Sequence, residues 1–316
     1  MNKKVLLLLL LFLALICIVF IALFIGINNN DPVQAAVIVR QLRMPRVLLA
    51  LLVGAGLSCV GLVFQALLRN SLAEPYTLGI SSGAALGASL SMLLRLNSIY
   101  TGVFSFVGSL FTIFVVYTVA SRKKFSNASL ILGGVTLGFL FSSIVLLIIA
   151  LIRQEGISNA VIWLMGDLSS ASPQAILFTA IFVLIGIVAF FILGRDLDVL
   201  CLGEEKAQQA GVNAISVKKL LFFIASLVTG ACVSSSGIIG FVGLIIPHAA
   251  RYLFGVRHRV LLIAASLMGA GFLLLCDTIA RTIALPLELP VGVITGIFGG
   301  IFFLTILTRT KKWQIM

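Results

Sequence analysis

The chain has 316 residues, of which 61% are hydrophobic and only 10% are charged. A soluble domain of this length has too little interior to bury so much apolar surface, so lipid is predicted to solvate most of the protein. The net charge of +12 would suggest a nucleic-acid partner in a soluble chain. Here the basic residues lie between apolar runs, where membrane topology accounts for them and no nucleic acid is implied.

Ten apolar runs are long enough, or nearly so, to cross a membrane as helices. A spanning helix needs about 20 apolar residues, because the hydrocarbon core is about 30 Å thick and each helical residue rises about 1.5 Å. The short alternating segments typical of a transmembrane β-barrel are absent from the sequence. We therefore predict an all-α polytopic membrane protein, a single domain over residues 1–316, with helices at about 5–27, 46–68, 76–94, 99–120, 129–152, 174–194, 216–236, 239–255, 260–281 and 289–308.

Three of these segments carry further signals. The first run extends from Val5 to about Ile27 with no small-residue cleavage site after it, which favours a retained span over a secretory signal. The run at 76–94 is rich in Gly, Ala and Ser and suits close helix packing. Residues 157–173 are predicted to form a short interfacial helix around Trp163. The cysteines show no metal-binding spacing and are interpreted as small hydrophobic residues: Cys17, Cys59, Cys201, Cys232 and Cys276.

The distribution of basic residues predicts the orientation. Ten spans put both termini on one side, and that side carries sixteen lysines and arginines against six on the other. Basic residues concentrate in the cytoplasm, so both termini are predicted to be cytoplasmic. Arg40, Arg43 and Arg46 oppose this rule because they cluster outside, just before the second span, which indicates another role for them.

Two segments resemble each other within the chain. GAGLSCVG at 54–61 and GACVSSSG at 230–237 share Gly, Ala, an apolar residue, Ser and Gly at equal spacing. The first segment runs inward and the second runs outward, which is the pattern of an inverted repeat in transporters. Small residues recur often in membrane helices, so chance similarity is the alternative.

The sequence lacks the motifs of an enzyme. There is no GxxxxGK[ST] nucleotide-binding loop and no Ser/His/Asp or Cys/His arrangement, and both histidines lie at one cytoplasmic corner. No span has a carboxylate near its middle, which argues against a secondary carrier driven by protons or sodium ions. We expect a non-enzymatic transport subunit that receives its energy from another chain and holds no cofactor or metal itself.

The longest charged cytoplasmic segment covers residues 195–219. Within it, LGEEKAQQAGV is predicted to be a short helix between Gly203 and Gly211. Its small residues and charges suit insertion into a cleft of a partner protein. An ordinary solvated loop is the alternative.

Several blocks, in order, resemble the FecCD-type permease family of iron-chelate and cobalamin ABC importers. They cover the chain almost end to end: RMPR (43–46), GLVFQALLRNSLAEPYTLGISSGAALGA (61–88), LGGVTLG (132–138), LGEEKAQQAG (202–211), GIIGFVGLIIPHAAR (237–251), CDTIAR with Asp277 and Arg281, and ELPVGVITGIFGGIFFL (288–304). NSLAEP replaces the usual NPLAEP, and GGI at 299–301 replaces GAP. These two departures affect local helix-end geometry.

The resemblance implies a type II ABC importer permease of ten helices in a bacterial cytoplasmic membrane. Two permease subunits, favoured as a homodimer, would surround the path, with two cytoplasmic ATPase subunits and an extracytoplasmic substrate-binding protein. ATP and Mg²⁺ would be bound by the ATPases. The implied cargo is a ferric siderophore or related metal chelate; cobalamin, haem and an ATP-independent secondary carrier are the alternatives.

The resemblance also assigns residues to roles. Arg43, Arg46 and Arg281 match external arginines that dock an acidic binding protein; lipid anchoring, or for Arg281 an i, i+4 pair with Asp277, is the alternative. The segment that couples to the ATPase comprises Leu202, Gly203, Glu204, Glu205, Ala207, Ala210 and Gly211.

Two further groups of residues are assigned less specific roles. Around the second and third spans, translocation and helix packing are both open for Gln65, Asn70, Glu74, Ser82 and Gly83. At the cytoplasmic end of the eighth span a structural role is predicted for Pro247, His248 and Arg251. Pro247 leaves a backbone carbonyl without its helical partner, and the side chains of His248 and Arg251 can reach polar groups or headgroups at the membrane surface.

Overall fold

The computed structural model describes residues 3–25, 32–123, 125–152, 154–284 and 287–309, which are mostly helical and contain no strand. Seven of the helices are long and apolar enough to cross a membrane, one of them formed by α3 together with the residues that precede it, and three more are apolar but shorter. These ten are α1 (Lys3–Phe24), α3 (Met44–Leu68), α4 (Ile80–Leu93), α5 (Ser98–Ser121), α6 (Asn127–Leu151), α8 (Pro173–Ile192), α11 (Ala214–Ser236), α12 (Val242–Phe254), α13 (His258–Thr282) and α14 (Val291–Arg309).

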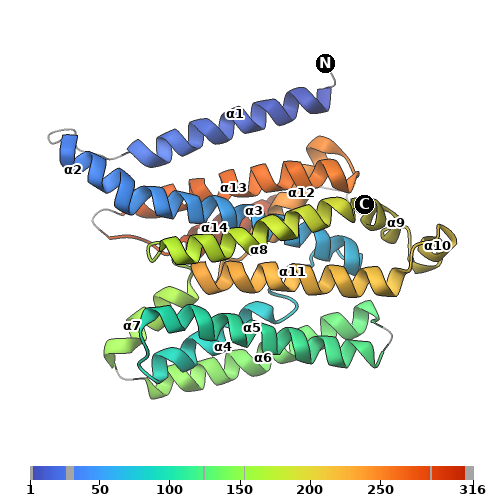
Figure 1. The fold of residues 1–316 in the computed structure, drawn as a ribbon, viewed down its shortest axis with the longest axis horizontal. Coiled ribbons are helices and arrows are strands. Elements are labelled where there is room, and N and C mark those ends of the chain that lie inside the picture. Colours follow the sequence, from blue (N-terminus) through green and yellow to red (C-terminus); the bar gives the residue numbers. More distant parts are fainter. Residues whose placement is uncertain (1–2, 26–31, 124, 153, 285–286, 310–316) are drawn as a thin grey trace.

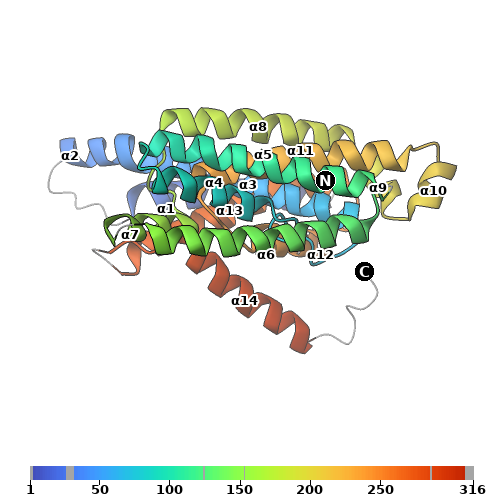
Figure 2. The same ribbon diagram turned by 90° about the horizontal axis from the view of Figure 1, so that it is seen from below.

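The remaining elements lie at the two ends of the bundle. One end, the α2 end, carries α2 (Pro32–Val37), the π-helix η1 (Ile38–Arg43) and α7 (Gln154–Leu164). The opposite end, the α10 end, carries α9 (Gly194–Leu200) and α10 (Glu204–Gln209). α1 begins near the α10 end, and α14 leaves the bundle at an angle as it runs from the α2 end (Figures 1 and 2).

The helix α3 forms the centre of the bundle. It packs against α8, α11, α12 and α13, and nearly all of its residues from Val53 onward are buried. By contrast, α1 lies along one edge and buries only Ala22 (Figure 1). One side of α1 packs its leucines against the core, whereas the other side exposes large apolar residues such as Leu13, Phe20 and Phe24. The sequence difference explains this arrangement, because α3 carries small residues that admit close neighbours whereas α1 is almost uniformly bulky.

Glycines set the distance between α3 and two of its neighbours. A Cβ built on Gly61 would lie 1.9 Å from the carbonyl oxygen of Gly243 in α12. One built on Gly54 would lie 2.3 Å from the carbonyl oxygen of Gly269 in α13. Both α3 glycines belong to the GAGLSCVG segment, so this segment brings backbones together. The inverted repeat suggested by that segment stays a prediction.

Polar side chains cap the N-termini of three helices. Ser126 Oγ accepts a hydrogen bond from the backbone N–H of Ser129 at the start of α6, and Ser172 Oγ accepts one from Ala175 before α8. Asn213 Oδ1 does the same for Ser216 at the start of α11. These bonds satisfy amide groups that lack intrahelical partners, which is why Ser and Asn favour such positions.

The ten predicted helices are confirmed. A short helix is present near Trp163, but α7 covers Gln154–Leu164 instead of 157–173, because residues 165–172 form a loop that contains Gly166 at φ +85°. Three further local corrections apply. The chain is already helical before residue 46, since α2 and η1 lead without interruption into α3; η1 accommodates Pro45, which cannot donate the bond that a regular helix requires. α4 begins at Ile80 instead of 76, after the turn at Gly79. The segment 195–219 holds a second helix, α9, before the predicted one.

Candidate functional site

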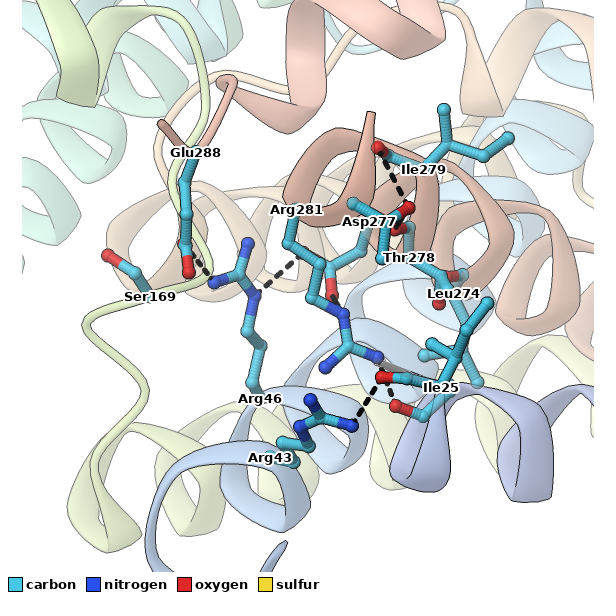
Figure 3. A network of polar contacts seen from close by, with 12 residues as sticks. Ile25, Arg43, Arg46, Ser169, Leu274, Asp277, Thr278, Ile279, Arg281 and Glu288 are labelled. Carbon is cyan, nitrogen blue, oxygen red and sulfur yellow. Dashed lines mark hydrogen bonds and ion pairs between the residues drawn. The ribbon is translucent and has the colours of Figure 1, made fainter. Parts of the chain in front are cut away.

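Charged side chains gather at both ends of the bundle. At the α2 end, the arginine cluster consists of Arg43, Arg46, Asp277, Arg281 and Glu288 (Figure 3). At the α10 end, the lysine cluster consists of Asn127, Glu204 and Lys218. Each cluster joins segments that are far apart in the sequence, and each contains residues for which the sequence predicted a partner-binding role.

Arg46 is the centre of the arginine cluster. Its Nε donates to Asp277 Oδ1 at 2.8 Å, and its Nη1 donates to Glu288 Oε2 at 2.5 Å. Asp277 is fully buried, whereas the Glu288 side chain is 52% exposed. The guanidinium therefore connects α3, α13 and the segment before α14, and it holds one carboxylate in the interior and one at the surface (Figure 3).

The other two arginines bind the last turn of α1. Arg43 Nη1 donates to the carbonyl oxygens of Leu23 (2.9 Å) and Ile25 (2.7 Å), and Arg281 Nη2 donates to that of Ala22. Terminal carbonyls of a helix lack amide partners and carry partial negative charge, so cations are favoured there. These acceptors carry no net charge, so the bonds to α1 do not themselves neutralise Arg43 or Arg281.

The structure thus brings the three predicted docking arginines together and shows what each one contacts. Arg46 and Arg281 are only 8% and 9% exposed, and Arg43 is half-buried. The predicted Asp277–Arg281 pair is present but long, at 3.9 Å. The pairing of Arg46 with Glu288 and with Asp277 was not predicted from the sequence, because these two carboxylates lie 242 and 231 positions away from Arg46.

Gln65 supplies the hydrogen bond that Pro247 cannot make. A proline in α12 cannot donate to the carbonyl of Gly243, four residues earlier. Gln65 Nε2 donates to that carbonyl instead, at 3.2 Å, and Gln65 Oε1 accepts from Arg251 Nη1 at 2.5 Å. The interpretation of Pro247 and Arg251 as structural is consistent with these contacts, and Gln65 lies in a helix-packing contact between α3 and α12.

Of the other residues around the second and third spans, Ser82 and Gly83 also lie in helix-packing contacts, whereas Glu74 lines a cavity. Gly83 packs against α5, where an added Cβ would lie 1.8 Å from Thr112 Oγ1, and Ser82 is buried near Gly138 of α6. Glu74 lines a small cavity between the loop 69–79 and the start of α12. Burial raises the pKa of the Glu74 carboxyl to about 7, and a backbone hydrogen bond from Phe241 opposes that shift.

Asn70 and His248 each form a hydrogen bond with a backbone group a few residues away, and His248 also contacts α14. Asn70 is exposed, and its Oδ1 accepts from the backbone N–H of Leu72 at 3.0 Å, which shapes the turn after α3. The Nδ1 of His248 lies 2.9 Å from the carbonyl oxygen of Leu244, and its ring meets Phe303 of α14 edge to face. His248 therefore contributes to the packing of α12 against α14.

α10 projects from its end of the bundle and matches the short helix that was predicted between Gly203 and Gly211. It starts after Gly203 (φ +115°) and is followed by Gly211 (φ +81°), two conformations that favour glycine. One part of the predicted small-residue face is not available to a partner, because Ala207 is fully buried. The exposed residues of the segment are Leu202, Glu204, Glu205, Lys206, Gln208, Gln209, Ala210 and Gly211.

The lysine cluster fastens α10 to the rest of the bundle. Lys218 in α11 is almost completely buried, and its Nζ donates to Glu204 Oε1 (2.5 Å) and Asn127 Oδ1 (2.8 Å). Asn127 Nδ2 donates in turn to the carbonyl of Leu68, the last residue of α3, at 2.9 Å. A buried ammonium group requires such partners. The network thereby links α10 to α11, α6 and α3.

Loss of the lysine cluster is expected to loosen α10. In Lys218→Met the charge-assisted bond to Glu204 disappears, and such bonds contribute about 1.5–3 kcal/mol. Local opening of α10 should rise accordingly, and trypsin should cleave after the exposed Lys206 about tenfold to a hundredfold faster. Limited proteolysis of the purified chain measures this rate.

Lys219→Met provides the matched control. Lys219 adjoins Lys218 but places its Nζ over the rings of Tyr117 and Phe125, away from α10. The two variants each remove one tryptic site. Equal cleavage rates in both would show that the bond to Glu204 does not hold α10 in place.

Comparison with known proteins agrees with this architecture. The model of the FecCD transport family matches residues 5–309. The chain is 40% identical over 253 residues to the cobalamin import system permease BtuC of Halobacterium salinarum, covering 79% of this chain and 68% of that protein. It is 37% identical over 256 residues to a protein of Helicobacter pylori strain J99 named as an iron chelatin transport system permease, covering 81% and 78%.

A solved structure shares nearly the whole fold. It is assigned to the metal-chelate type of ABC transporter in an inward-facing conformation, and it superposes with a TM-score of 0.90 at 32% identity over 96% of this chain and 99% of that one. The family match covers all ten apolar helices, both charged clusters and the α10 segment. This multi-pass membrane protein belongs to the FecCD transport family.

Proposed function

We propose that the chain is the permease subunit of an ATP-driven importer that carries a ferric siderophore or a related metal chelate across a bacterial cytoplasmic membrane. The observation that carries this proposal is α10, a short exposed helix bounded by two glycines and fixed to the transmembrane bundle by the lysine cluster. Such a helix suits a groove on a separate ATPase. The cargo is proposed from relatives named for iron chelatin and cobalamin; cobalamin and haem are the other candidates.

The orientation follows from charge. The α10 end carries the larger share of lysines and arginines, including Arg195 near the start of α9, Lys218 and Lys219 near the start of α11, and Arg257 and Arg259 at the start of α13. By the positive-inside rule this end faces the cytoplasm, together with both termini. The arginine cluster then faces outward, where it is placed to receive an acidic substrate-binding protein.

The proposed assembly contains a second copy of this chain. α14 diverges from the bundle (Figure 2). Large apolar side chains along one face of this helix are exposed. Their exposed fractions range from 44% to 64%: Ile297, Phe298, Ile301 and Leu304. A partner permease that covers this face would enclose a central path between the two subunits, as in other symmetric oligomers.

Transport in this assembly proceeds by alternating access. Nucleotide binding draws the two ATPases together and displaces the two α10 helices. Each α10 pulls on Lys218, and through Asn127 the displacement reaches the cytoplasmic ends of α6 and α3. The chain itself holds no nucleotide, and ATP and Mg²⁺ belong to the ATPase subunits.

A pull-down tests the proposal. The tagged chain is solubilised from its native membrane in mild detergent, and co-purifying proteins are identified by mass spectrometry. We expect an ATPase and an extracytoplasmic binding protein, and differently tagged copies should recover each other. Recovery of the chain alone, under conditions that preserve a known ABC importer, would favour the ATP-independent secondary carrier.

A single substitution should remove the ATPase from this pull-down. Ala210 is exposed just after α10, so Ala210→Trp adds bulk to the proposed contact without disturbing the core. We expect at least about a tenfold reduction in recovered ATPase, equivalent to roughly 1.4 kcal/mol. Lys123→Trp, on the turn after α5, is the control and should leave recovery unchanged. Ala207→Trp is unsuitable because Ala207 lies in the core.

A further inference from the structure

We propose that Glu288 is an exchangeable internal ligand of Arg46, which an acidic side chain of the docking partner replaces. This inference rests on the proposed docking of an acidic binding protein at the arginine cluster. The new element is that Glu288 accepts the Nη1 hydrogen bond of Arg46 before the partner binds. The starting observation is that Arg46 holds two carboxylates whose surroundings differ strongly (Figure 3).

The two carboxylates cannot leave Arg46 with equal ease. Asp277 is fully buried on α13 and lies near a second guanidinium, so releasing it would strand a charge in the interior. The Glu288 side chain is 52% exposed, and water can solvate its carboxylate as soon as the bond to Arg46 breaks. Exchange at Arg46 therefore takes place at the Nη1 position, which Glu288 occupies, and the Nε bond to Asp277 stays.

The backbone around Glu288 is already fixed by other bonds. The N–H of Leu289 donates to the carbonyl of Ala280 at 3.0 Å, and that of Val291 donates to Gly166 at 3.2 Å. Neither bond involves the Glu288 side chain. The carboxylate can consequently move away by rotation about its own side-chain torsions while the segment before α14 keeps its place.

The charge balance of the cluster identifies the partner as acidic. Three guanidiniums face two carboxylates, and the bonds from Arg43 and Arg281 to the end of α1 use neutral acceptors. An incoming carboxylate restores the bond that Arg46 gives up and meets the remaining positive charge. A neutral or basic surface gains neither, so Glu288 also selects against such partners by competing with them for Arg46.

Neutralising Glu288 should therefore strengthen docking. The probe is the extracytoplasmic protein recovered in the pull-down, and its binding to the purified chain in nanodiscs is followed by biolayer interferometry. Glu288→Gln is expected to bind it about threefold more tightly or better, mainly through a faster association rate. Glu288→Asp keeps the charge and should stay close to wild type. Melting temperatures of all variants are measured in the same nanodiscs.

Asp167→Asn is the matched control. Asp167 is another carboxylate at the α2 end, and its Oδ1 accepts only from the backbone N–H of Ser169 among the described bonds. This variant changes the net charge of that end by the same amount without freeing an arginine. An equal gain in Asp167→Asn would mean that net charge alone determines docking, and would overturn the exchange.

Two other results would also test the exchange at Arg46. Weaker docking or a markedly lower melting temperature in Glu288→Gln would make Glu288 a structural support for Arg46 and overturn the exchange, while the docking itself would stand. Failure of the wild-type chain to bind any extracytoplasmic protein would instead overturn the docking function and the exchange with it.

Discussion

Replacing Asp277 by alanine is expected to destabilise the protein by about 3–5 kcal/mol. Asp277 is fully buried and is the acceptor for Arg46 Nε, and Arg281 lies near its second oxygen. Without it, two guanidiniums that are less than 10% exposed lose their buried counter-charge. Breaking a buried ion pair from one side is far more costly than never having formed it. Denaturant unfolding of the purified chain, followed by size-exclusion chromatography, measures the loss.

Two further variants make this result specific. Asp277→Asn keeps an acceptor for Arg46 and should lose less stability than Asp277→Ala. Asp167→Ala removes a partly exposed carboxylate from the same end and should cost less than about 1 kcal/mol. If Asp277→Ala behaved like Asp167→Ala, the arginine cluster would contribute little to folding.

Replacing Gly61 by alanine is expected to have the other large effect. The added Cβ would lie 1.9 Å from the carbonyl oxygen of Gly243, so α12 would have to move away from α3. Backbone cannot yield as a flexible side chain does, and overpacking of this kind costs about 1–3 kcal/mol or more. The shift would also stretch the bonds of Gln65 to α12. We expect a melting temperature several degrees lower and a reduced yield of monodisperse protein.

Gly271→Ala serves as its control. Gly271 also lies within a long helix, but an added Cβ would meet only the ends of the Leu15 and Ile18 side chains, at 3.5 and 3.6 Å. These are ordinary contacts, so stability should change little. A melting temperature for Gly61→Ala equal to that of Gly271→Ala would contradict the close approach of α3 and α12.

The candidate sites were partly predictable. The sequence identified Arg43, Arg46 and Arg281 because they oppose the charge rule or match a family motif, and it identified α10 because its bounding glycines and charges are contiguous. It missed Lys218 and Asn127 as partners of Glu204, since nothing local marks a lysine as buried. It also placed Ala207 on an exposed face, because the side of a six-residue helix that packs inward depends on its neighbours.

What the sequence alone determined is the class of the protein and its ten apolar helices. Hydropathy and helix breakers act over neighbouring residues, so the helices can be located without knowledge of the fold. Only the tertiary structure decided that Arg46 pairs with Asp277, 231 positions away, and that Gln65 supplies the bond that Pro247 cannot make. Such partners are chosen by which helices pack side by side, and small residues such as Gly61 set how closely they approach.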